Sequence, residues 1–402
     1  MSSSSSAEGN INTGFVGSVA QQSAHRWSAG GGGDASACVA GRSMRESQFS
    51  LAEIVGEESL RGRAMSAGYL LRLIDICAGR VSWLHSRCAT TTACFEKLAI
   101  SRPVLHNDLV RAEGRLVDKG RSSMNVFVEV FRQDVGSGKF LRICHCNVRM
   151  VALDAKTGRP NPNIPDLVLT EEELQQVIPL RGNLKNPRQR ASEEEEPRPL
   201  LTKDLVEDPC NQDKDSWVHM DETEVVQIIQ PMPMHLNILN TVFGGDLLQL
   251  MERTATYTAR LFCGDRNTLT VRMHDVSFRM PVQVTDLVKI RGRVSFVRNT
   301  NLQVLIEVWV IKPDGQEVLS HDGHFTVGCF DEVGCRSFIE KGILLDDEDE
   351  QSLVIYHQAR RIHEELKEFE SKHGEIFLLN PRHKGGRFSF SAAKRTKSTG
   401  DA

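Results

Sequence analysis

The chain has 402 residues, which is too long for one ordinary small domain and favours two to three domains. Its hydrophobic content of 40% and charged content of 25% are those of an ordinary globular protein, and no run approaches the ~18 to 20 apolar residues of a membrane helix. The net charge of −4, with both signs mixed along most of the chain, provides no global field for nucleic acid or a membrane surface. We therefore expect neither a nucleic-acid partner nor a membrane span.

The N-terminal segment, residues 1–46, is rich in serine and glycine and is predicted to be disordered. Arg26 is its first basic residue, so the segment lacks the arginine-rich composition of a mitochondrial presequence. It also lacks the apolar region of a secretory signal. The segment by itself therefore indicates no compartment.

A mostly apolar helix is predicted over residues 67–79, followed by β-rich segments from 104 to 152. The helix contains a carboxylate, Asp75, between two isoleucines. A carboxylate in an apolar helix is costly unless it is paired, and desolvation raises its pKa towards that of a useful general base. Arg72, three residues earlier, could instead form an ordinary ion pair with it on one helix face.

The ten cysteines are scattered along the chain and predict reduced thiols rather than a metal site. The closest pair, Cys144 and Cys146, lies in the first β-rich region and lacks the second pair that a structural zinc site needs. We expect no metal, no cofactor and a reducing compartment.

Composition divides the rest of the chain. A first folded block is expected over residues 47–170, and a linker rich in proline and charge over 171–216. A second folded block is expected over 217–340. Residues 341–402 contain an acidic stretch, a polar helical pattern and a basic tail, which we interpret as a solubilising end.

The two blocks are copies of each other. AGYLLRLIDICAG, which starts at 67, aligns with GGDLLQLMERTAT, which starts at 244, at an offset of 177 and sets Asp75 against Glu252. RPVLHNDLVRAEGRLV aligns with MPVQVTDLVKIRGRVS at an offset of 178. The proline-containing turn at 313–316 makes the last two strands of the second copy a hairpin. An apolar helix followed by antiparallel strands is best buried when the sheet wraps around it.

With this pattern, the sequence resembles the hotdog-fold acyl-CoA thioesterases. Asn237, the glycines Gly244 and Gly245 after Phe243, and the run ending at Glu252 look like the helix signature of that family. Two copies with a linker look most similar to the mitochondrial acyl-coenzyme A thioesterases of types nine and ten. The resemblance implies an α+β fold of two tandem hotdog domains, each a curved antiparallel sheet around a central helix.

The residues fit the chemistry of thioester hydrolysis, which needs an activated water, a polarised carbonyl and a grip on coenzyme A. Glycines at a helix start let a ligand reach free N–H groups, which explains Gly244, Gly245 and Gly68. They could equally serve only the close packing of helix on sheet. Each carboxylate alone, Asp75 or Glu252, could be structural or functional, but their equivalent positions in the repeat favour function.

The resemblance implies a site between the paired copies, with an asparagine from one and an acid from the other. Asn237 has Leu60 as its counterpart in the first copy, and leucine cannot orient a water. We therefore predict one competent site, built on Asn237, Gly244, Gly245 and Asp75. A second, degenerate site would keep Glu252.

The family motif for coenzyme A points to a polar triplet before a strand in each copy. A guanidinium and hydroxyls suit phosphates, although an ordinary polar turn would look the same. The triplets are Arg121, Ser122 and Ser123 in the first copy and Arg298, Asn299 and Thr300 in the second.

We expect hydrolysis of acyl-CoA to fatty acid and coenzyme A by a carboxylate-activated water. Two alternatives are a non-catalytic acyl-CoA-binding or assembly module and a hotdog enoyl-CoA hydratase. The hydratase is disfavoured because residues 67–80 and 240–262 contain no histidine. A serine hydrolase is disfavoured because a GxSxG elbow is absent. The resemblance also implies a homo-oligomer and a mitochondrial location, with the cytoplasm as the alternative.

Overall fold

The computed structural model describes residues 41–373, apart from 63, 135, 182–215, 265, 333 and 347. The predicted disordered segment up to residue 40, most of the predicted linker and the basic tail from 374 lie outside the described residues. Within the described residues, no helix combines the length and apolarity needed to cross a bilayer.

The elements of the first copy and the start of the linker are, in chain order, β1 (Arg42–Ser43), β2 (Gln48–Ile54), β3 (Leu60–Arg61), β4 (Ala64–Met65), α2 (Ala67–Ser86), β5 (Ala89–Phe95), β6 (Leu98–Ala99), β7 (Leu109–Lys119), β8 (Ser123–Gln133), β9 (Phe140–Leu153), β10 (Leu167–Val168) and α3 (Glu171–Val177). Those that follow are β11 (Val218–His219), β12 (Val225–Ile229), α5 (Gly244–Phe262), β13 (Asn267–Met273), β14 (Val276–Phe278), β15 (Leu287–Arg298), β16 (Asn301–Ile311), β17 (Glu317–Phe330), β18 (Ile343–Leu344) and α6 (Glu350–His373).

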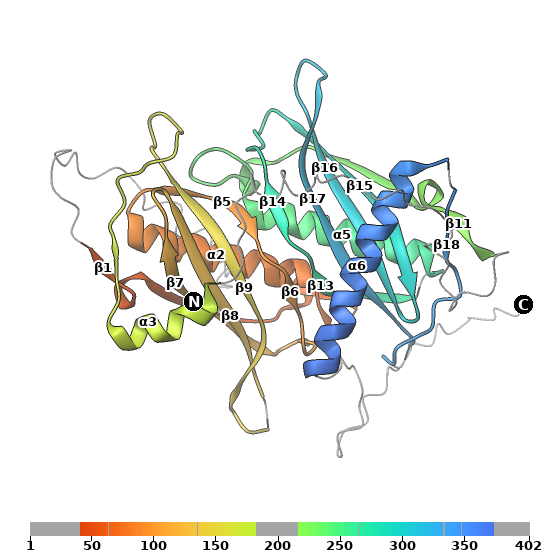
Figure 1. Cartoon of the computed structure of the whole chain (residues 1–402), viewed down its shortest axis with the longest axis horizontal. Helices are drawn as coiled ribbons and strands as arrows, with labels where there is room; N and C mark the ends of the chain where they lie inside the picture. Colours follow the sequence, from red (N-terminus) through yellow and green to blue (C-terminus); the bar gives the residue numbers. More distant parts are fainter. Residues whose placement is uncertain are drawn as a thin grey trace, which may run out of the picture. The chain divides into compact units, whose positions relative to one another are not determined.

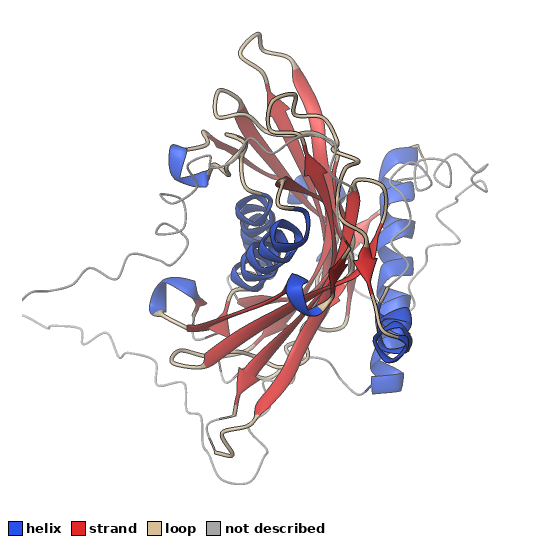
Figure 2. Cartoon of the chain, turned by 90° about the vertical axis from the view of Figure 1, so that its left-hand side faces the viewer, coloured by secondary structure: helices blue, strands red, loops and turns tan. Residues whose placement is uncertain are grey.

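The long strands form one antiparallel sheet of 12 strands among the described residues. Its order is β12-β15-β16-β17-β14-β5-β9-β8-β7-β2, and β13 and β6 pair beside this path. Among the described residues, both copies lie in one compact unit. Figure 2 shows α2 and α5 side by side with the strands curving around them, and α6 against the opposite face of the sheet.

The two copies join through reciprocal strand pairs, β14 with β5 and β6 with β13. Val276 lies opposite Phe95, and Leu98 lies opposite Met273. The differences 276 − 98 and 273 − 95 both equal 178, which is the offset of the sequence repeat. Each copy therefore makes to its partner the contact that its partner makes to it, as two subunits do across a two-fold axis.

The irregularities of the sheet repeat as well. The register shifts after Thr92 in β5 and after Thr270 in β13, which are again 178 residues apart. Two further shifts, at Val130 in β8 and Val308 in β16, are also 178 residues apart. A β-bulge redirects neighbouring side chains and is common beside active sites, so the first pair marks positions of interest.

The two central helices begin differently. The hydroxyl of Ser66 caps α2 and accepts a hydrogen bond from the N–H of Gly68 at 3.2 Å. The capping position of α5 is Phe243, whose side chain makes no cap hydrogen bond. Both helices end after the predicted apolar run, and α2 continues to Ser86, beyond the predicted residue 79.

Several predictions about elements can be compared with the structure. The hairpin of β16 and β17 is confirmed: the N–H of Lys312 donates to the carbonyl oxygen of Gln316 at 2.9 Å, and Gly315 has a φ of +86°. The prediction of disorder is wrong for residues 42–46, which contribute β1 and most of a 3₁₀ turn. The predicted linker begins with α3, which has a capping box formed by Thr170 and Glu173, because both residues satisfy N–H groups at the helix start.

Figure 1 shows α6 lying across the outer face of β15, β16 and β17. The ring of Tyr356 on α6 packs edge-on against Phe296 of β15, with 5.1 Å between ring centroids. The predicted polar helix therefore buries an apolar side against the second copy.

Candidate active site

Asp75 lies in the middle of α2, and its side chain is fully buried. Its Oδ2 accepts a hydrogen bond from the backbone N–H of Gly245 at 2.6 Å. Its Oδ1 accepts a hydrogen bond from the hydroxyl of Thr92 on β5 at 2.7 Å. The acid of the first copy therefore meets the helix start of the second copy.

Burial is the main influence on the ionisation of Asp75. It raises the pKa of the carboxyl group to about 6, because the charged form loses its hydration. The hydrogen bonds from Thr92 and Gly245 lower the pKa, and the nearby charge of Asp246 raises it. A carboxyl group that titrates near pH 6 is mostly ionised at neutral pH and can accept a proton there.

Arg72 does not neutralise Asp75 by an ion pair along the helix. Its Nε instead contacts Asp246 Oδ1 at 2.6 Å, from α2 to the first turn of α5. The simple structural interpretation of Asp75 as half of a helix-face ion pair is therefore wrong, because Asp246 holds the guanidinium group.

The two glycines of α5 lie where an added side chain would be crowded. A Cβ atom at Gly244 would lie 3.2 Å from Asp75 Oδ2 and 3.3 Å from both Phe278 Cε1 and Thr92 Oγ1. A Cβ atom at Gly245 would lie 2.7 Å from the ring of Phe243. The packing interpretation of these glycines agrees with this geometry, because close packing of the two helices brings the N–H group of Gly245 to the carboxylate. Their role towards a ligand stays a prediction.

Asn237 lies in the loop before α5, where its side chain closes the loop. Its Oδ1 accepts hydrogen bonds from the N–H groups of Leu239 and Thr241, and its Nδ2 donates to the hydroxyl of Thr241 at 2.8 Å. Within the described residues, it makes no hydrogen bond to Asp75. The structure therefore joins Asp75 to Gly245 and leaves the Asn237 amide in contact with its own loop.

Glu252 occupies the equivalent place on α5 and is also buried. Its Oε2 accepts a hydrogen bond from the hydroxyl of Ser66 at 2.8 Å, and its Oε1 accepts one from Thr270 at 2.9 Å. The same Ser66 hydroxyl accepts the N–H of Gly68, so a side chain separates this carboxylate from the helix start. In the other half, the counterpart of Ser66 is Phe243, and the carboxylate reaches the helix directly.

Thr92 and Thr270 are site residues that our sequence reasoning missed. Each follows its helix on the next strand, each donates to the buried carboxylate of its own copy, and each lies at a register shift. The available signal was their shared offset of 178. Threonine is so common in strands that only the offset distinguishes the two residues.

The two polar triplets predicted for coenzyme A lie in turns between long strands. Arg121 is exposed in the turn between β7 and β8, and the carbonyl oxygen of Ser122 accepts the N–H of Ala152 at 2.8 Å. In the second turn, Asn299 has a φ of +55°, and its carbonyl oxygen accepts the N–H of Ile339 at 2.8 Å.

Ser123 begins β8, and the second triplet is completed by Arg298 and by Thr300, whose carbonyl oxygen accepts the N–H of Cys329. Each triplet has one exposed residue, Arg121 or Asn299, and two half-buried ones. Within the described residues, neither turn makes a hydrogen bond or ion pair with Asp75 or Glu252.

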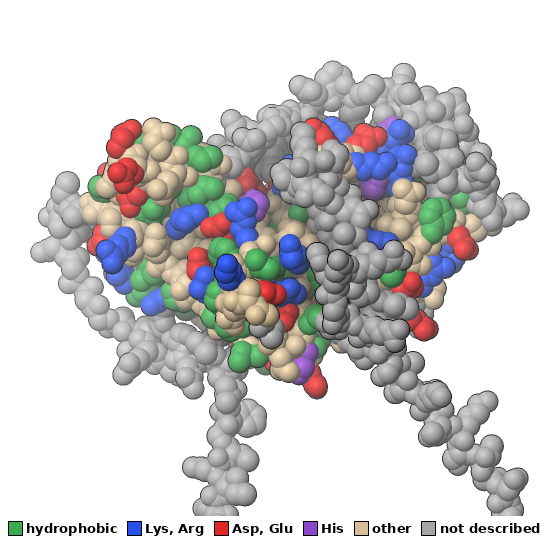
Figure 3. All heavy atoms as spheres, turned by 90° about the horizontal axis from the view of Figure 1, so that it is seen from below, with side chains coloured by type: hydrophobic (Ala, Val, Ile, Leu, Met, Phe, Trp, Pro, Cys, Tyr) green, Lys and Arg blue, Asp and Glu red, His purple; other side chains and the backbone are tan. Residues whose placement is uncertain are grey.

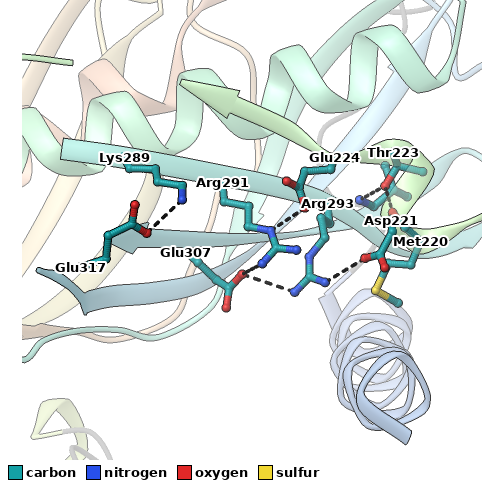
Figure 4. Close-up of polar contacts among 10 residues, drawn as sticks. Met220, Asp221, Thr223, Glu224, Lys289, Arg291, Arg293, Glu307 and Glu317 are labelled. Carbon is teal, nitrogen blue, oxygen red and sulfur yellow. Dashed lines mark hydrogen bonds and ion pairs between the residues drawn. The ribbon is translucent and has the colours of Figure 1, made fainter. Parts of the chain in front are cut away.

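A second group of charged side chains lies on β15 and β16, and Figure 4 shows how its members point towards one another. Arg293 lies between Asp221 and Glu307, and Arg291 contacts Glu224 at 2.6 Å. Because these carboxylates are held by guanidinium groups, we assign the group to the anchoring of the segment before β12 and not to catalysis.

The surface view in Figure 3 shows basic and acidic side chains interspersed on the face that it presents. Among the described residues, no group of three or more histidine, cysteine, aspartate or glutamate side chains is placed to hold a metal ion.

Comparison with known families identifies the domains. The model of the thioesterase superfamily matches the chain twice, at residues 63–139 and 239–315. Human mitochondrial acyl-coenzyme A thioesterase 9 is 24% identical over 328 residues, which cover 71% of this chain and 72% of the human protein. Mouse acyl-coenzyme A thioesterase 11 is 26% identical over 67% of this chain, and the chain spans only 44% of the mouse protein.

Solved structures include similar proteins. An acyl-CoA hydrolase from Bacillus cereus is 28% identical, with a TM-score of 0.35, and the match covers 38% of this chain and 95% of the bacterial chain. A structure described as an apo-hexameric acyl-CoA thioesterase is 23% identical, with a TM-score of 0.34 over 40% of this chain and 100% of its own.

Proposed function

The chain contains two hotdog domains of the thioesterase superfamily in tandem, and we propose that it hydrolyses acyl-CoA thioesters to free fatty acid and coenzyme A. The observation that carries the proposal is the buried carboxyl group of Asp75, with a pKa of about 6, hydrogen-bonded to the first turn of α5 at Gly245. This arrangement combines a base with backbone donors at one point.

In the proposed reaction, the thioester carbonyl oxygen takes the place of the Asp75 carboxylate at the N–H groups of α5. Asp75 then accepts a proton from a water molecule as the water oxygen attacks the carbonyl carbon. The N–H groups at Gly244 and Gly245 and the positive end of the helix dipole stabilise the oxyanion. Collapse of this intermediate breaks the carbon–sulfur bond, and the thiolate takes the proton back from Asp75.

Asn237 is the proposed orienting residue. Its amide would exchange its bond to Thr241 for one to the water or the thioester carbonyl, which lie at the start of the same helix. Arg121, Ser122 and Ser123 are proposed to contact the phosphates of coenzyme A. The counterparts at Arg298, Asn299 and Thr300 are proposed to do so more weakly.

The matched pair Asp75→Asn and Glu252→Gln tests the proposal, because both substitutions remove only a charge at equivalent positions. We expect Asp75→Asn to lower kcat for thiol release by about 10²- to 10⁴-fold, the usual contribution of a general base. Glu252→Gln should retain most of the activity. A loss confined to Glu252→Gln would reverse the assignment and contradict the asymmetry.

A non-catalytic acyl-CoA-binding module is the second candidate function. It is favoured by one observation, that the side chain of Asn237 is already hydrogen-bonded within its own loop. Tight binding of acyl-CoA without release of thiol by the wild-type protein would support this candidate against hydrolysis.

We also propose a homo-oligomer, a mitochondrial location and a reaction without a metal or other cofactor. The name of the human relative supports the mitochondrial location. The description of the hexameric structure supports the homo-oligomer. Sedimentation of the purified protein and fractionation of cells test them, with the cytoplasm as the alternative compartment. Thiol release that survives exhaustive chelation would support the third.

A further inference from the structure

Two phenyl rings line the Asp75 site beside the glycines. The ring of Phe243 lies over Gly245, and the ring of Phe278 on β14 lies over Gly244, where it would contact an added Cβ atom at 3.3 Å. Asp75 and Thr92 lie around the same point, at 3.2 and 3.3 Å from that Cβ position. The two rings are therefore the apolar side chains that lie closest to this helix start.

Two further rings pack around Phe278. Phe95 lies 6.3 Å from it between ring centroids, and His321 of β17 packs edge-on against it at 4.7 Å. His321 is 1% exposed, and its Nδ1 has no hydrogen-bond partner among the described residues. Burial lowers the pKa of His321 to about 3, so the imidazole is neutral at physiological pH.

The degenerate site lacks the two phenyl rings. At the offset of 177 for the helices, Ser66 stands in place of Phe243. At the offset of 178 for the strands, Ile100 stands in place of Phe278. Ile100 is 3% exposed, and its N–H donates to the carbonyl oxygen of Val271 at 3.0 Å. A Cβ atom at Gly68 would meet Gln249 and Glu252 rather than a ring.

We propose that the half-buried ring of Phe278 closes the acyl end of the Asp75 site and sets the longest acyl chain that this site accepts. The inference rests on the proposed thioesterase function for its substrate class. The phosphates of coenzyme A do not suit a wall of phenyl rings, so the acyl group is the part of the substrate that fits against Phe243 and Phe278. The opposite half, with Ile100, carries no such limit.

The test measures binding of S-alkyl coenzyme A thioethers of increasing chain length, which cannot be hydrolysed, by titration calorimetry with the full-length protein. We expect Phe278→Ala to move the tightest binding to longer chains, by about fourfold in Kd for each additional methylene that becomes buried. Phe278→Trp should move it to shorter chains. Ile100→Ala is the matched control and should leave the wild-type dependence on chain length unchanged.

An unchanged dependence in folded Phe278→Ala and Phe278→Trp proteins would overturn the inference, and so would an equal shift in Ile100→Ala. If Phe278→Ala does not fold, the opposite shift in Phe278→Trp still decides the question. Release of thiol from the matching acyl-CoA series is measured in parallel. Binding that shifts as expected without any thiol release would contradict the proposed hydrolysis and support the role of Phe278.

Discussion

At the scale of single residues, Asp75 and Glu252 have the same kind of neighbour and different access to a helix start. Each carboxylate accepts a hydrogen bond from a threonine, but only Asp75 also accepts a backbone N–H directly. Our sequence analysis identified both carboxylates because charge is rare in an apolar helix. It could not identify Ser66 as the group that separates Glu252 from the start of α2, because serine before a helix is an ordinary cap.

The hydrogen bond from Thr92 has a consequence for pH dependence. This bond lowers the pKa of Asp75, so its removal in Thr92→Val should raise that pKa above about 6. Because the base must be ionised, kcat/KM falls as pH falls through this pKa. The acidic limb of the curve of kcat/KM against pH should therefore move to higher pH in Thr92→Val. The pH profile of thiol release measures the shift.

Thr270→Val is the matched control for Thr92→Val, since it removes the corresponding bond to Glu252. It should leave the acidic limb in place. Movement of the limb in Thr270→Val alone would indicate that Glu252 is the base.

At the scale of elements, the starts of the two central helices explain the asymmetry. The first helical residue is Gly244 in α5 and Ala67 in α2, so the methyl group that would crowd Asp75 is already present in the other half. The sequence repeat showed this difference. That the space above Gly244 is bounded by Asp75, Thr92 and Phe278 is decided by the packing of α2, β5 and β14 around the start of α5.

Gly244→Ala should therefore lower kcat/KM for thiol release by at least about tenfold. The added methyl group would displace groups that must be aligned for attack on the thioester, and such misalignment is costly. The added Cβ would meet its three neighbours at 3.2 to 3.3 Å. Gly79→Ala in α2 is the control, since its nearest neighbour would be Met150 at 4.0 Å.

In that control, the free energy of unfolding should rise by about 0.5 to 1 kcal/mol, with activity unchanged, because alanine favours a helix interior over glycine. Chemical denaturation and the thiol assay measure both effects. Full activity in Gly244→Ala would mean that the substrate does not approach this helix start.

At the scale of the whole molecule, α6 connects the two copies near their reciprocal strand pairs. Glu365 contacts Lys97 of the first copy at 3.5 Å, and His274 and Arg272 of the second at 3.6 and 3.7 Å. The contact with His274 is the largest cause that lowers the pKa of Glu365 to about 2.

Glu365→Gln should lower stability at neutral pH, and the difference should disappear in acid. A carboxyl group whose folded pKa lies below its usual 4.5 contributes stability above pH 4.5, and this contribution is lost as pH falls towards 2. Denaturation midpoints at several pH values measure the difference. Its size is limited by solvent, because the Glu365 side chain is 44% exposed.

Glu364→Gln is the control for Glu365→Gln, because Glu364 contacts only Arg360 of its own helix among the ion pairs that the structure describes. It should change stability little at any pH. An equal effect of both substitutions would assign the change to helix charge and not to the connection between the copies.

The sequence by itself determined the tandem fold, because apolar periodicity and a repeat with a constant offset are local properties that any alignment of the chain with itself reveals. It also determined the two carboxylates and the glycines. Only the tertiary structure decided which groups meet: Asp75 with Gly245, Arg72 with Asp246, and Phe278 with Gly244. The physical reason is that the first two contacts cross between the copies and the third joins a strand to the helix start of its own copy. Their geometry therefore depends on how α2, α5 and the connecting strands pack together.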